Sequence, residues 1–363
     1  MHSKRSIFWI IALTLITILI FYFGREEIVG LLKKANLATM GGLFLLQVFT
    51  LGLTAFQWHF MLKKAGATCS PGMAFAVTMA GNYVESVTPA AKLGGESARI
   101  YLFHQRTGLS YERLAGILLA LKYFSLLPFV ALVAISLGLA FWRYELPLFV
   151  PGAFVLLALF FLATWWLHKK GGPGTDPAGA GSLIKSDRPG RETGPDQNVI
   201  LEKNTGKICK KYRAVIAFTA KASADSRYLV NFRERIALIF ISALIWSLYP
   251  LKVYIVCHML FIDADFLTVA MVTYTAYMIS MVPLLPGGLG SFEGSMALLF
   301  SMGGLSPASG LTIALLTRLA TYWFPLLLSA LASLYVAAGL NSAPPPAKGA
   351  FSGSEERKPG LQG

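Results

Sequence analysis

The sequence predicts an all-α, polytopic helical membrane protein with about six full spans, two re-entrant segments broken by proline and glycine, and an inverted-topology repeat. Composition is the first reason: 55% of the 363 residues are hydrophobic and 14% are charged, whereas about 25% of a soluble domain is charged. Several apolar stretches approach the roughly 20 residues that cross a bilayer. Two of them end in similar proline- and glycine-rich breaks. These observations exclude a soluble enzyme, a disordered chain and a small disulfide-stapled domain.

Six apolar stretches are long enough to span the membrane: 7–23, 37–62, 114–141, 147–167, 236–261 and 311–339. The first follows Met-His-Ser-Lys-Arg, as in a signal peptide, but no small-x-small cleavage site comes after it. We therefore expect a retained signal anchor. Segments 72–91 and 266–285 differ, because each runs into a break, Thr88–Glu96 in one and Pro283–Gly290 in the other. We expect both segments to be re-entrant, entering and leaving the membrane on one side.

The two breaks belong to an internal repeat. A shift of 197 residues places Pro89 on Pro286 and Glu96 on Glu293, and brings the flanking apolar segments into register. The predicted organisation is a signal-anchor span and outer loop (1–36), a first repeat (37–141), a linking span (142–167), a basic, partly disordered cytoplasmic insert (168–235), a second repeat (236–340) and a disordered cytoplasmic tail (341–363).

Lysine and arginine predict the orientation, because they concentrate in cytoplasmic loops. With both broken segments re-entrant and the N-terminus inside, 25 of the 32 fall inside, four outside and three within spans. The first break then opens to the cytoplasm and the second to the outside, so the repeats are inverted. Inverted repeats with broken helices are a transporter design. We expect a multi-pass protein of the cytoplasmic (inner) membrane with both termini cytoplasmic; an N-out chain in which every segment spans is the alternative.

The insert 168–235 opens with Gly171-Gly172-Pro173-Gly174 and has no long apolar run. Its second half is basic, and is either an amphipathic helix on an anionic membrane face or a solvated linker. The formal charge of +14 would suggest nucleic acid in a soluble protein, but here cytoplasmic loops explain it. The expected partners are membrane lipids and, through the insert, a cytoplasmic lipid-synthesis enzyme, with no nucleic acid; the oligomeric state is left open.

Ionisable residues inside spans are costly and indicate function. Arg318 lies about seven residues into its span with Tyr322 on the same face. It binds a phosphate or carboxylate headgroup, or it pairs with a carboxylate such as Glu293. Arg99 and Glu96 are three residues apart, so they form a salt bridge that ties the first break down or they contact a headgroup.

Segment 72–91 carries Asn82 and Glu85 on one face. Glu85 carries a coupling proton, since burial disfavours a charged carboxylate, or accepts hydrogen bonds from the broken backbone. Lys122 lies well inside its span, and Lys252, after Pro250, could snorkel to the interface. The break glycines permit a turn and could offer N–H groups to an anion. The residues expected to bind substrate are Asn82, Glu85, Lys92, Gly94, Gly95, Glu96, Arg99, Lys122, Pro286, Gly287, Gly288, Gly290, Glu293, Arg318 and Tyr322.

No cofactor or metal is expected. The chain has no GxxxxGK[ST] loop for ATP, and its five histidines show no paired ligand spacing. Asp263-Ala264-Asp265 has the form of a divalent-metal motif, but at the end of a span we favour an outside cap.

Two motifs carry a resemblance to a known family. The stretch Pro89–Arg99, followed by Thr107-Gly108-Leu109-Ser110, resembles the first signature of the flippase-like membrane domain of lysylphosphatidylglycerol synthases. Closer still are Pro283–Glu293, Gly304-Leu305-Ser306 and Leu316–Tyr322, which resemble its second signature. The resemblance covers residues 1–340 apart from the insert, and implies lipid flipping or lipid handling. Family members often carry a Glu-Arg pair where this chain has Leu121-Lys122, and no synthase domain is attached, so aminoacyl transfer is not expected.

Three functions remain in view. The first is a transporter-like protein, not an enzyme, that moves or binds anionic, aminoacylated or isoprenoid-linked lipids, including lipids of hopanoid pathways, whose headgroup enters a polar cleft between the two breaks. The second is a membrane-embedded lipid or glycosyl transferase component. The third is a non-catalytic membrane partner of a lipid-synthesis enzyme.

Overall fold

The computed structural model describes residues 14, 17, 25–88, 91–144, 229–281 and 286–341. Every element of secondary structure in these ranges is a helix. Four helices are long and apolar enough to cross a membrane, so the predicted all-α, polytopic membrane fold is confirmed. The predicted span 147–167, nearly all of 7–23, most of the insert and nearly all of the tail lie outside the described residues, and the number of full spans stays a prediction.

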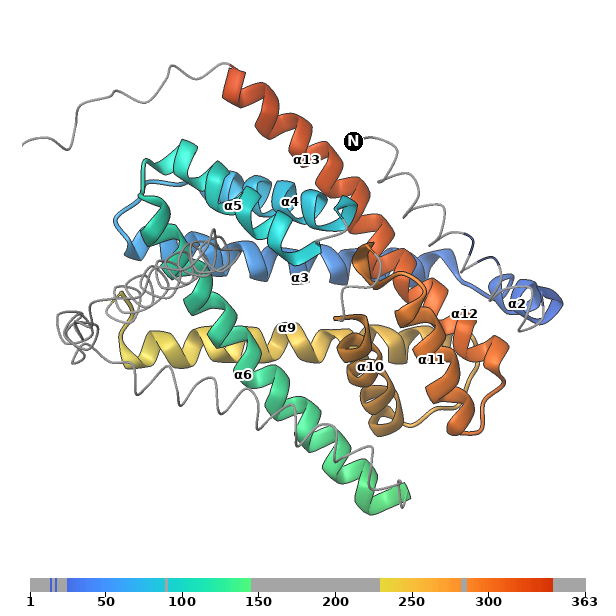
Figure 1. The fold of residues 1–363 in the computed structure, drawn as a ribbon. Coiled ribbons are helices and arrows are strands. Elements are labelled where there is room, and N and C mark those ends of the chain that lie inside the picture. The colour runs from blue at the N-terminus through green and yellow to red at the C-terminus, as the bar shows by residue number, and fades with distance from the viewer. Residues whose placement is uncertain are drawn as a thin grey trace, which may run out of the picture.

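Twelve elements follow one another in the described part of the chain (Figure 1). They are α2 (Arg25–Leu32), α3 (Leu37–Lys64), α4 (Pro71–Val87), α5 (Ala91–Thr107), α6 (Tyr111–Tyr144), α9 (Phe232–Met259), α10 (Phe266–Ser280), the 3-10 turn η1 (Pro286–Gly288), α11 (Ser291–Met302), α12 (Pro307–Arg318), the π-helical turn η2 (Leu319–Trp323) and α13 (Phe324–Asn341).

The helices form two sets in the same order: long, short, short, long. The first set is α3, α4, α5 and α6; the second is α9, α10, α11 and the continuous run α12–η2–α13, and each member begins 195 to 200 residues after its counterpart. The caps recur as well. Asn36 and Asn231 precede α3 and α9, while Ser110 and Ser306 precede α6 and α12. Each serine hydroxyl accepts a hydrogen bond from the backbone N–H three residues on, which satisfies a free donor of the first turn.

The first helices of the two sets, α3 and α9, pack side by side in opposite directions (Figure 1). Gln57 Nε2 donates to Ser242 Oγ at 2.8 Å, and Lys252 Nζ donates to Gln47 Oε1 at 2.6 Å. Residue numbers therefore fall along α3 as they rise along α9. An inverted repeat requires this antiparallel arrangement.

Each broken segment is a pair of packed short helices, α4 with α5 and α10 with α11. At 1.5 Å per residue, α4 and α10 are about 25 Å and about 22 Å long, which is less than the hydrocarbon core of about 30 Å. Asp265 caps α10, because its Oδ1 accepts a hydrogen bond from Leu267 N at 2.9 Å. The Asp-Ala-Asp sequence therefore includes a helix cap.

The last helix of each set packs on the hairpin of the other set: α13 on α4, and α6 on α10. Four hydrophobic clusters of buried residues occur in the described part of the chain, and the two largest draw on both sets of helices. One surrounds Phe292 and Phe300 and includes Leu43 of α3; the other surrounds Trp58 and Phe103 and includes residues of α9 and α13. The two halves therefore share their cores and do not fold as independent units.

The outer surface of the long helices is apolar. Large exposed side chains on it include Leu45, Phe49 and Phe56 of α3, Phe240 of α9, and Leu327, Leu331 and Leu334 of α13. A continuous apolar surface promotes aggregation in water, but it is the surface expected of a helix that faces lipid tails.

Candidate functional site

The first break is shorter than the sequence predicts. α4 ends at Val87 and α5 begins at Ala91, so Gly94, Gly95 and Glu96 lie within α5. The expectation that Gly94 and Gly95 form the turn is wrong. These glycines permit close packing instead: a Cβ at Gly95 would lie 2.6 Å from Glu85 Cβ and 2.7 Å from the Gly81 carbonyl oxygen.

Arg99 of α5 joins the two helices of the first hairpin. Its Nη2 donates to Glu85 Oε2 at 2.9 Å and also to Asn82 Oδ1. The Arg99 side chain is 9% exposed and runs across Gly81, where a Cβ would lie 2.6 Å from its Nε. Asn82 and Glu85 therefore share a face of α4, and that face is turned toward Arg99.

Glu96 does not pair with Arg99. Its carboxylate forms an ion pair with Lys122 of α6. Although the two residues are one turn apart on α5, Glu96 faces α6 while Arg99 faces α4. Lys122 therefore has an acidic partner from another helix. Its side chain is 51% exposed.

The second break is a glycine turn. Gly287, Gly288 and Gly290 have φ of 63°, 66° and 79°, a region that glycine adopts without steric strain. A Cβ at Gly287 would lie 2.7 Å from Tyr322 Cζ, so the glycine also makes room for the tyrosine ring. At this break the predicted role of the glycines agrees with their backbone conformation.

Arg318 and Glu293 close the second break. Arg318 Nε lies 3.2 Å from Glu293 Oε1, with the side chains 7% and 1% exposed. Arg318 Nη2 donates to the Gly288 carbonyl at 3.1 Å, and Gly290 N donates to Glu293 Oε2 at 2.6 Å. The guanidinium also lies 4.2 Å from the centre of the Phe292 ring, a favourable cation–π distance. The buried pair thus satisfies backbone groups that the break leaves free.

The two ion pairs occupy equivalent places in the repeat. Glu96 and Glu293 lie near the start of α5 and α11, while Lys122 and Arg318 lie on the long helix that follows each hairpin. They differ in exposure, because Lys122 is half exposed and Arg318 is buried. The fold therefore presents two versions of one arrangement, one accessible and one closed.

The two breaks approach each other through Tyr322. This residue lies in the π-helical turn η2, a departure from regular helix that often marks functional sites. Its hydroxyl donates to the Ser86 carbonyl at 3.2 Å, and its ring lies against Gly287. Tyr322 thus connects the end of α4 to the second break.

The structure brings most of the predicted residues into two clusters. The first holds Asn82, Glu85, Gly95, Glu96, Arg99 and Lys122; the second holds Gly287, Gly288, Gly290, Glu293, Arg318 and Tyr322. Gly94 packs against the Thr88 side chain. The side chains of Lys92 and Pro286 lie outside the described residues. The clusters are packed, with Arg99, Glu293 and Arg318 buried, where the sequence leads us to expect a polar cleft.

Sequence reasoning missed two residues and misjudged a third. Gly81 has no break motif around it, and only the packing of α5 reveals its role. Ser86 takes part through its carbonyl group, which carries no sequence signal. Lys252 does not snorkel: it is 0% exposed and bonds to α3. The polar residues Gln47 and Thr50 within a span were the available signal for its partners.

A groove of about 470 Å³ lies beside the first hairpin. It runs between the start of α4 and α13, and its lining includes Met73, Leu331 and Tyr335. None of the break residues lines it, so it belongs to the apolar surface rather than to the two clusters.

Comparison with known proteins supports the same reading of the fold. A sequence model of the family described as the lysylphosphatidylglycerol synthase TM region matches residues 9–329. The chain is 24% identical over 334 residues to a UPF0104 membrane protein of Methanothermobacter thermautotrophicus, covering 89% of this chain and 93% of that protein. It is 23% identical to one of Pyrococcus horikoshii (90% and 95%) and 27% identical to one of Archaeoglobus fulgidus (85% and 89%). The chain is therefore a membrane protein that belongs to the lysylphosphatidylglycerol synthase transmembrane-region family.

Proposed function

We propose that this protein is a transporter-like lipid flippase that binds the anionic headgroup of a membrane lipid at the two breaks and moves it across the membrane. One observation carries the proposal. Two broken hairpins of opposite orientation each place a carboxylate–cation pair at equivalent positions, Glu96–Lys122 and Glu293–Arg318. The substrate class includes anionic, aminoacylated and isoprenoid-linked lipids, because each has a phosphate group.

The first cluster supports binding of such a headgroup. Lys122 lies 11 residues inside α6, and its side chain is 51% exposed, so a phosphate can approach it without unfolding the hairpin. Arg99 adds a buried Nε that has no hydrogen-bond acceptor among the described residues. A cation inside a span that is not fully enclosed by its partner is a candidate for ligand contact.

The second cluster supports movement. In the present conformation Arg318 is enclosed by Glu293, Phe292 and Tyr322. The symmetry of the repeat predicts a second conformation in which the exposures are exchanged: the Glu293–Arg318 pair opens on the opposite side while Glu96–Lys122 closes. This exchange is how inverted repeats give alternating access. Acyl or isoprenoid tails stay in the surrounding lipid.

Orientation follows from the positive-inside distribution, which supports a cytoplasmic membrane location with the first cluster reached from the cytoplasm. A role of the insert as a docking segment for a lipid-synthesis enzyme remains a second proposal. Deleting 168–228 tests it. The deletion must stop before Val230, which is buried in the core around Trp58 and Phe103 and whose carbonyl accepts a hydrogen bond from Arg235 Nε.

The function is tested by transbilayer movement of headgroup-labelled phosphatidylglycerol in proteoliposomes. Lys122→Gln removes the exposed cation and is expected to slow movement about tenfold or more, since a hydrogen bond to a charged group contributes about 1.5–3 kcal/mol. Lys64→Gln is the matched control. Lys64 also pairs with a glutamate, Glu234, and is 37% exposed, but it lies at the end of α3.

Three outcomes are distinct. Fast movement in wild type and Lys64→Gln with slow movement in Lys122→Gln supports the proposal. Equal rates in all three proteins overturn the role of Lys122. No movement of phosphatidylglycerol, an aminoacyl lipid or an isoprenoid phosphate by folded wild-type protein overturns transport and favours the enzyme-partner role, which the 168–228 deletion then tests by loss of partner binding.

A further inference from the structure

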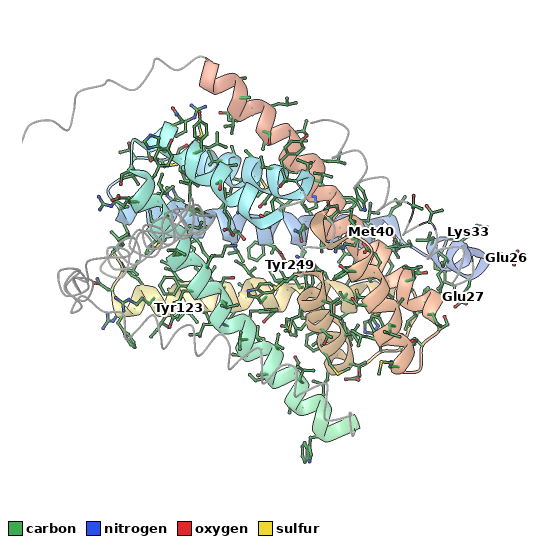
Figure 2. All side chains as sticks on the ribbon, viewed as in Figure 1. Glu26, Glu27, Lys33, Met40, Tyr123 and Tyr249 are labelled. Carbon is green, nitrogen blue, oxygen red and sulfur yellow. The ribbon has the colours of Figure 1, made fainter. Side chains whose placement is uncertain are left out.

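Lys252 is a buried lysine that the proposed headgroup clusters do not use. It lies on α9 facing α3, and it is 0% exposed. Its Nζ donates to Gln47 Oε1 at 2.6 Å and to Thr50 Oγ1 at 2.9 Å, and lies 4.7 Å from the centre of the Tyr249 ring. Figure 2 shows Tyr249 in the middle of the molecule, between α9 and α3.

The partners of Lys252 set it apart from the other interior cations. Arg99, Lys122 and Arg318 each pair with a carboxylate. Within the parts of the chain that the structure describes, Lys252 has only neutral partners, an amide, a hydroxyl and an aromatic ring. A buried ammonium without a counter-charge is disfavoured relative to the neutral amine, so this position favours exchange of a proton.

The geometry accommodates both forms of the amine. Thr50 donates its own hydroxyl proton to the Leu46 carbonyl at 2.7 Å, so its oxygen acts as an acceptor toward Lys252. Two acceptors hold two N–H groups, which the neutral amine and the ammonium both possess. The third position faces the Tyr249 ring, where an ammonium gains a cation–π contact and a neutral amine presents its lone pair. One proton can thus be gained or lost while the two hydrogen bonds persist.

Few ionisable groups surround this amine. α10 contains no charged residue, and its Tyr277 contacts Tyr249. The charges of Arg318 on α12 and Lys122 on α6 are paired. The remaining charged residues on the helices packed against Lys252 lie in the first or last turns of those helices: Lys63 and Lys64 on α3, Glu112, Arg113 and Arg143 on α6, and Arg233, Glu234 and Arg235 on α9. On α3 His59 lies nine residues beyond Thr50, and on α9 the rings of Tyr254 and His258 meet edge to face. Tyr249 is the titratable group directly against Lys252, and Tyr249 in turn lies within electrostatic range of the Glu85 carboxylate of α4.

A continuous series of ring contacts connects Lys252 to the second break. Tyr249 and Tyr277 have ring centres 4.8 Å apart, Tyr277 and Phe292 have theirs 5.0 Å apart, and the Arg318 guanidinium lies 4.2 Å from the Phe292 centre. The rings thus lie between an amine that can change charge and a guanidinium that closes the break. A change at Lys252 alters what the Tyr249 ring packs against, and through it the packing of α10 against α11.

We infer that Lys252 is a proton-binding site whose occupancy controls the opening of the second break. The role in opening rests on the proposed lipid transport; the proton site itself does not. On protonation a hydronium ion gives its proton to the Nζ lone pair and becomes water; on release one N–H bond breaks and a water molecule accepts the proton, so no further reactant is needed.

The proton site is tested by thermal unfolding of the purified full-length protein in detergent between about pH 6 and about pH 9. Wild type is compared with Lys252→Met and with the control Lys64→Met. Because burial disfavours the ammonium, the melting temperature of wild type is expected to rise with pH relative to Lys252→Met, while Lys64→Met follows wild type. A constant difference between wild type and Lys252→Met overturns the proton site. If Lys252→Met does not fold, Thr50→Val replaces it: a shifted pH profile supports the site, and an unchanged profile overturns it.

Control of the break is tested by lipid movement over the same pH range. The rate of lipid movement by wild type is expected to change with pH. The rates of Lys252→Met and Lys252→Arg are expected not to depend on pH. Retained pH dependence in both variants overturns the control of the break. A pH-dependent melting difference without lipid movement in any variant overturns the proposed transport and leaves the proton site standing.

Discussion

Arg318 shows how one residue can hold a broken helix together inside a membrane. Its guanidinium pairs with Glu293, bonds to the Gly288 carbonyl and stacks on Phe292. Glu293 in turn accepts from Gly290 N. Each member satisfies a backbone group of the turn as well as its partner, so removing either leaves several buried groups unpaired.

Breaking this buried pair is expected to destabilise the protein strongly. Arg318→Met leaves the Glu293 carboxylate buried without a partner, and the expected loss is about 3–5 kcal/mol of unfolding free energy. Glu293→Gln keeps the acceptor for Gly290 N but leaves the guanidinium unpaired. The double variant should lose less than the sum of the two single losses, because neither charge remains. Denaturant unfolding in detergent measures the unfolding free energy of wild type, the two single variants and the double variant. If the losses of the two single variants add up to that of the double variant, the pair is not coupled.

Tyr322 connects the two halves and makes a smaller contribution to the free energy of unfolding. Tyr322→Phe keeps the ring against Gly287 but removes the hydrogen bond to the Ser86 carbonyl, and the expected loss is about 0.5–1.5 kcal/mol. Tyr335→Phe is the control, since Tyr335 is 66% exposed and should change stability little. Equal melting temperatures for the two variants would argue against a contribution from this bond.

At the residue scale the sequence predicts which side chains matter better than it predicts their partners. The Arg318–Glu293 pair is one of two alternatives that the sequence leaves open. The Arg99–Glu96 pairing is wrong, because neighbours on one helix face different helices in the fold. Lys252 bonds to residues about 200 positions away, and no local spacing can reveal such a partner.

At the scale of elements, the hairpin α4–α5 also shows that contacts between helices cannot be predicted from local sequence. Hydropathy predicts the helices well, because apolar length and breaks are local properties. The sequence predicts too long a first break, since Gly94 and Gly95 are typical turn residues. They lie inside α5, because the close approach of α4 requires a residue without a side chain there.

This packing predicts opposite effects for two glycine substitutions. Gly95→Ala places a Cβ 2.7 Å from the Gly81 carbonyl oxygen, and is expected to destabilise the protein by about 1–3 kcal/mol. Gly52→Ala, inside α3 with nothing within 4 Å of the added Cβ, is expected to stabilise it by about 0.5–1 kcal/mol. Thermal unfolding in detergent measures both, and a stabilising Gly95→Ala would contradict the packing of the hairpin.

At the scale of the whole molecule the account depends on inversion. The antiparallel α3 and α9, the exchanged packing of α6 and α13, and the equivalent ion pairs all follow from two similar halves of opposite direction. The sequence predicts the repeat from one shift of the chain. It does not predict the shared cores or the difference in exposure between the two pairs, which depend on how the halves pack.

Cysteine accessibility in intact membrane vesicles tests the inversion most directly. In the background protein Cys69, Cys209 and the buried Cys257 are all replaced by Ser. Each reporter cysteine is then present singly, with Cys69 restored in one variant. Cys69 and Arg113→Cys report the two ends of the first hairpin, and Asp263→Cys and Met302→Cys those of the second. Partial burial raises the pKa of the Cys69 thiol, so maleimide labelling is done at about pH 8 to supply thiolate.

The account predicts that a membrane-impermeant maleimide labels Asp263→Cys and Met302→Cys from outside. It also predicts that Cys69 and Arg113→Cys react only when the reagent reaches the cytoplasmic side. Labelling of the two ends of one hairpin from opposite sides would show that the segment spans the membrane. Labelling of all four positions from one side would show that the repeats are not inverted, and either result would contradict the account.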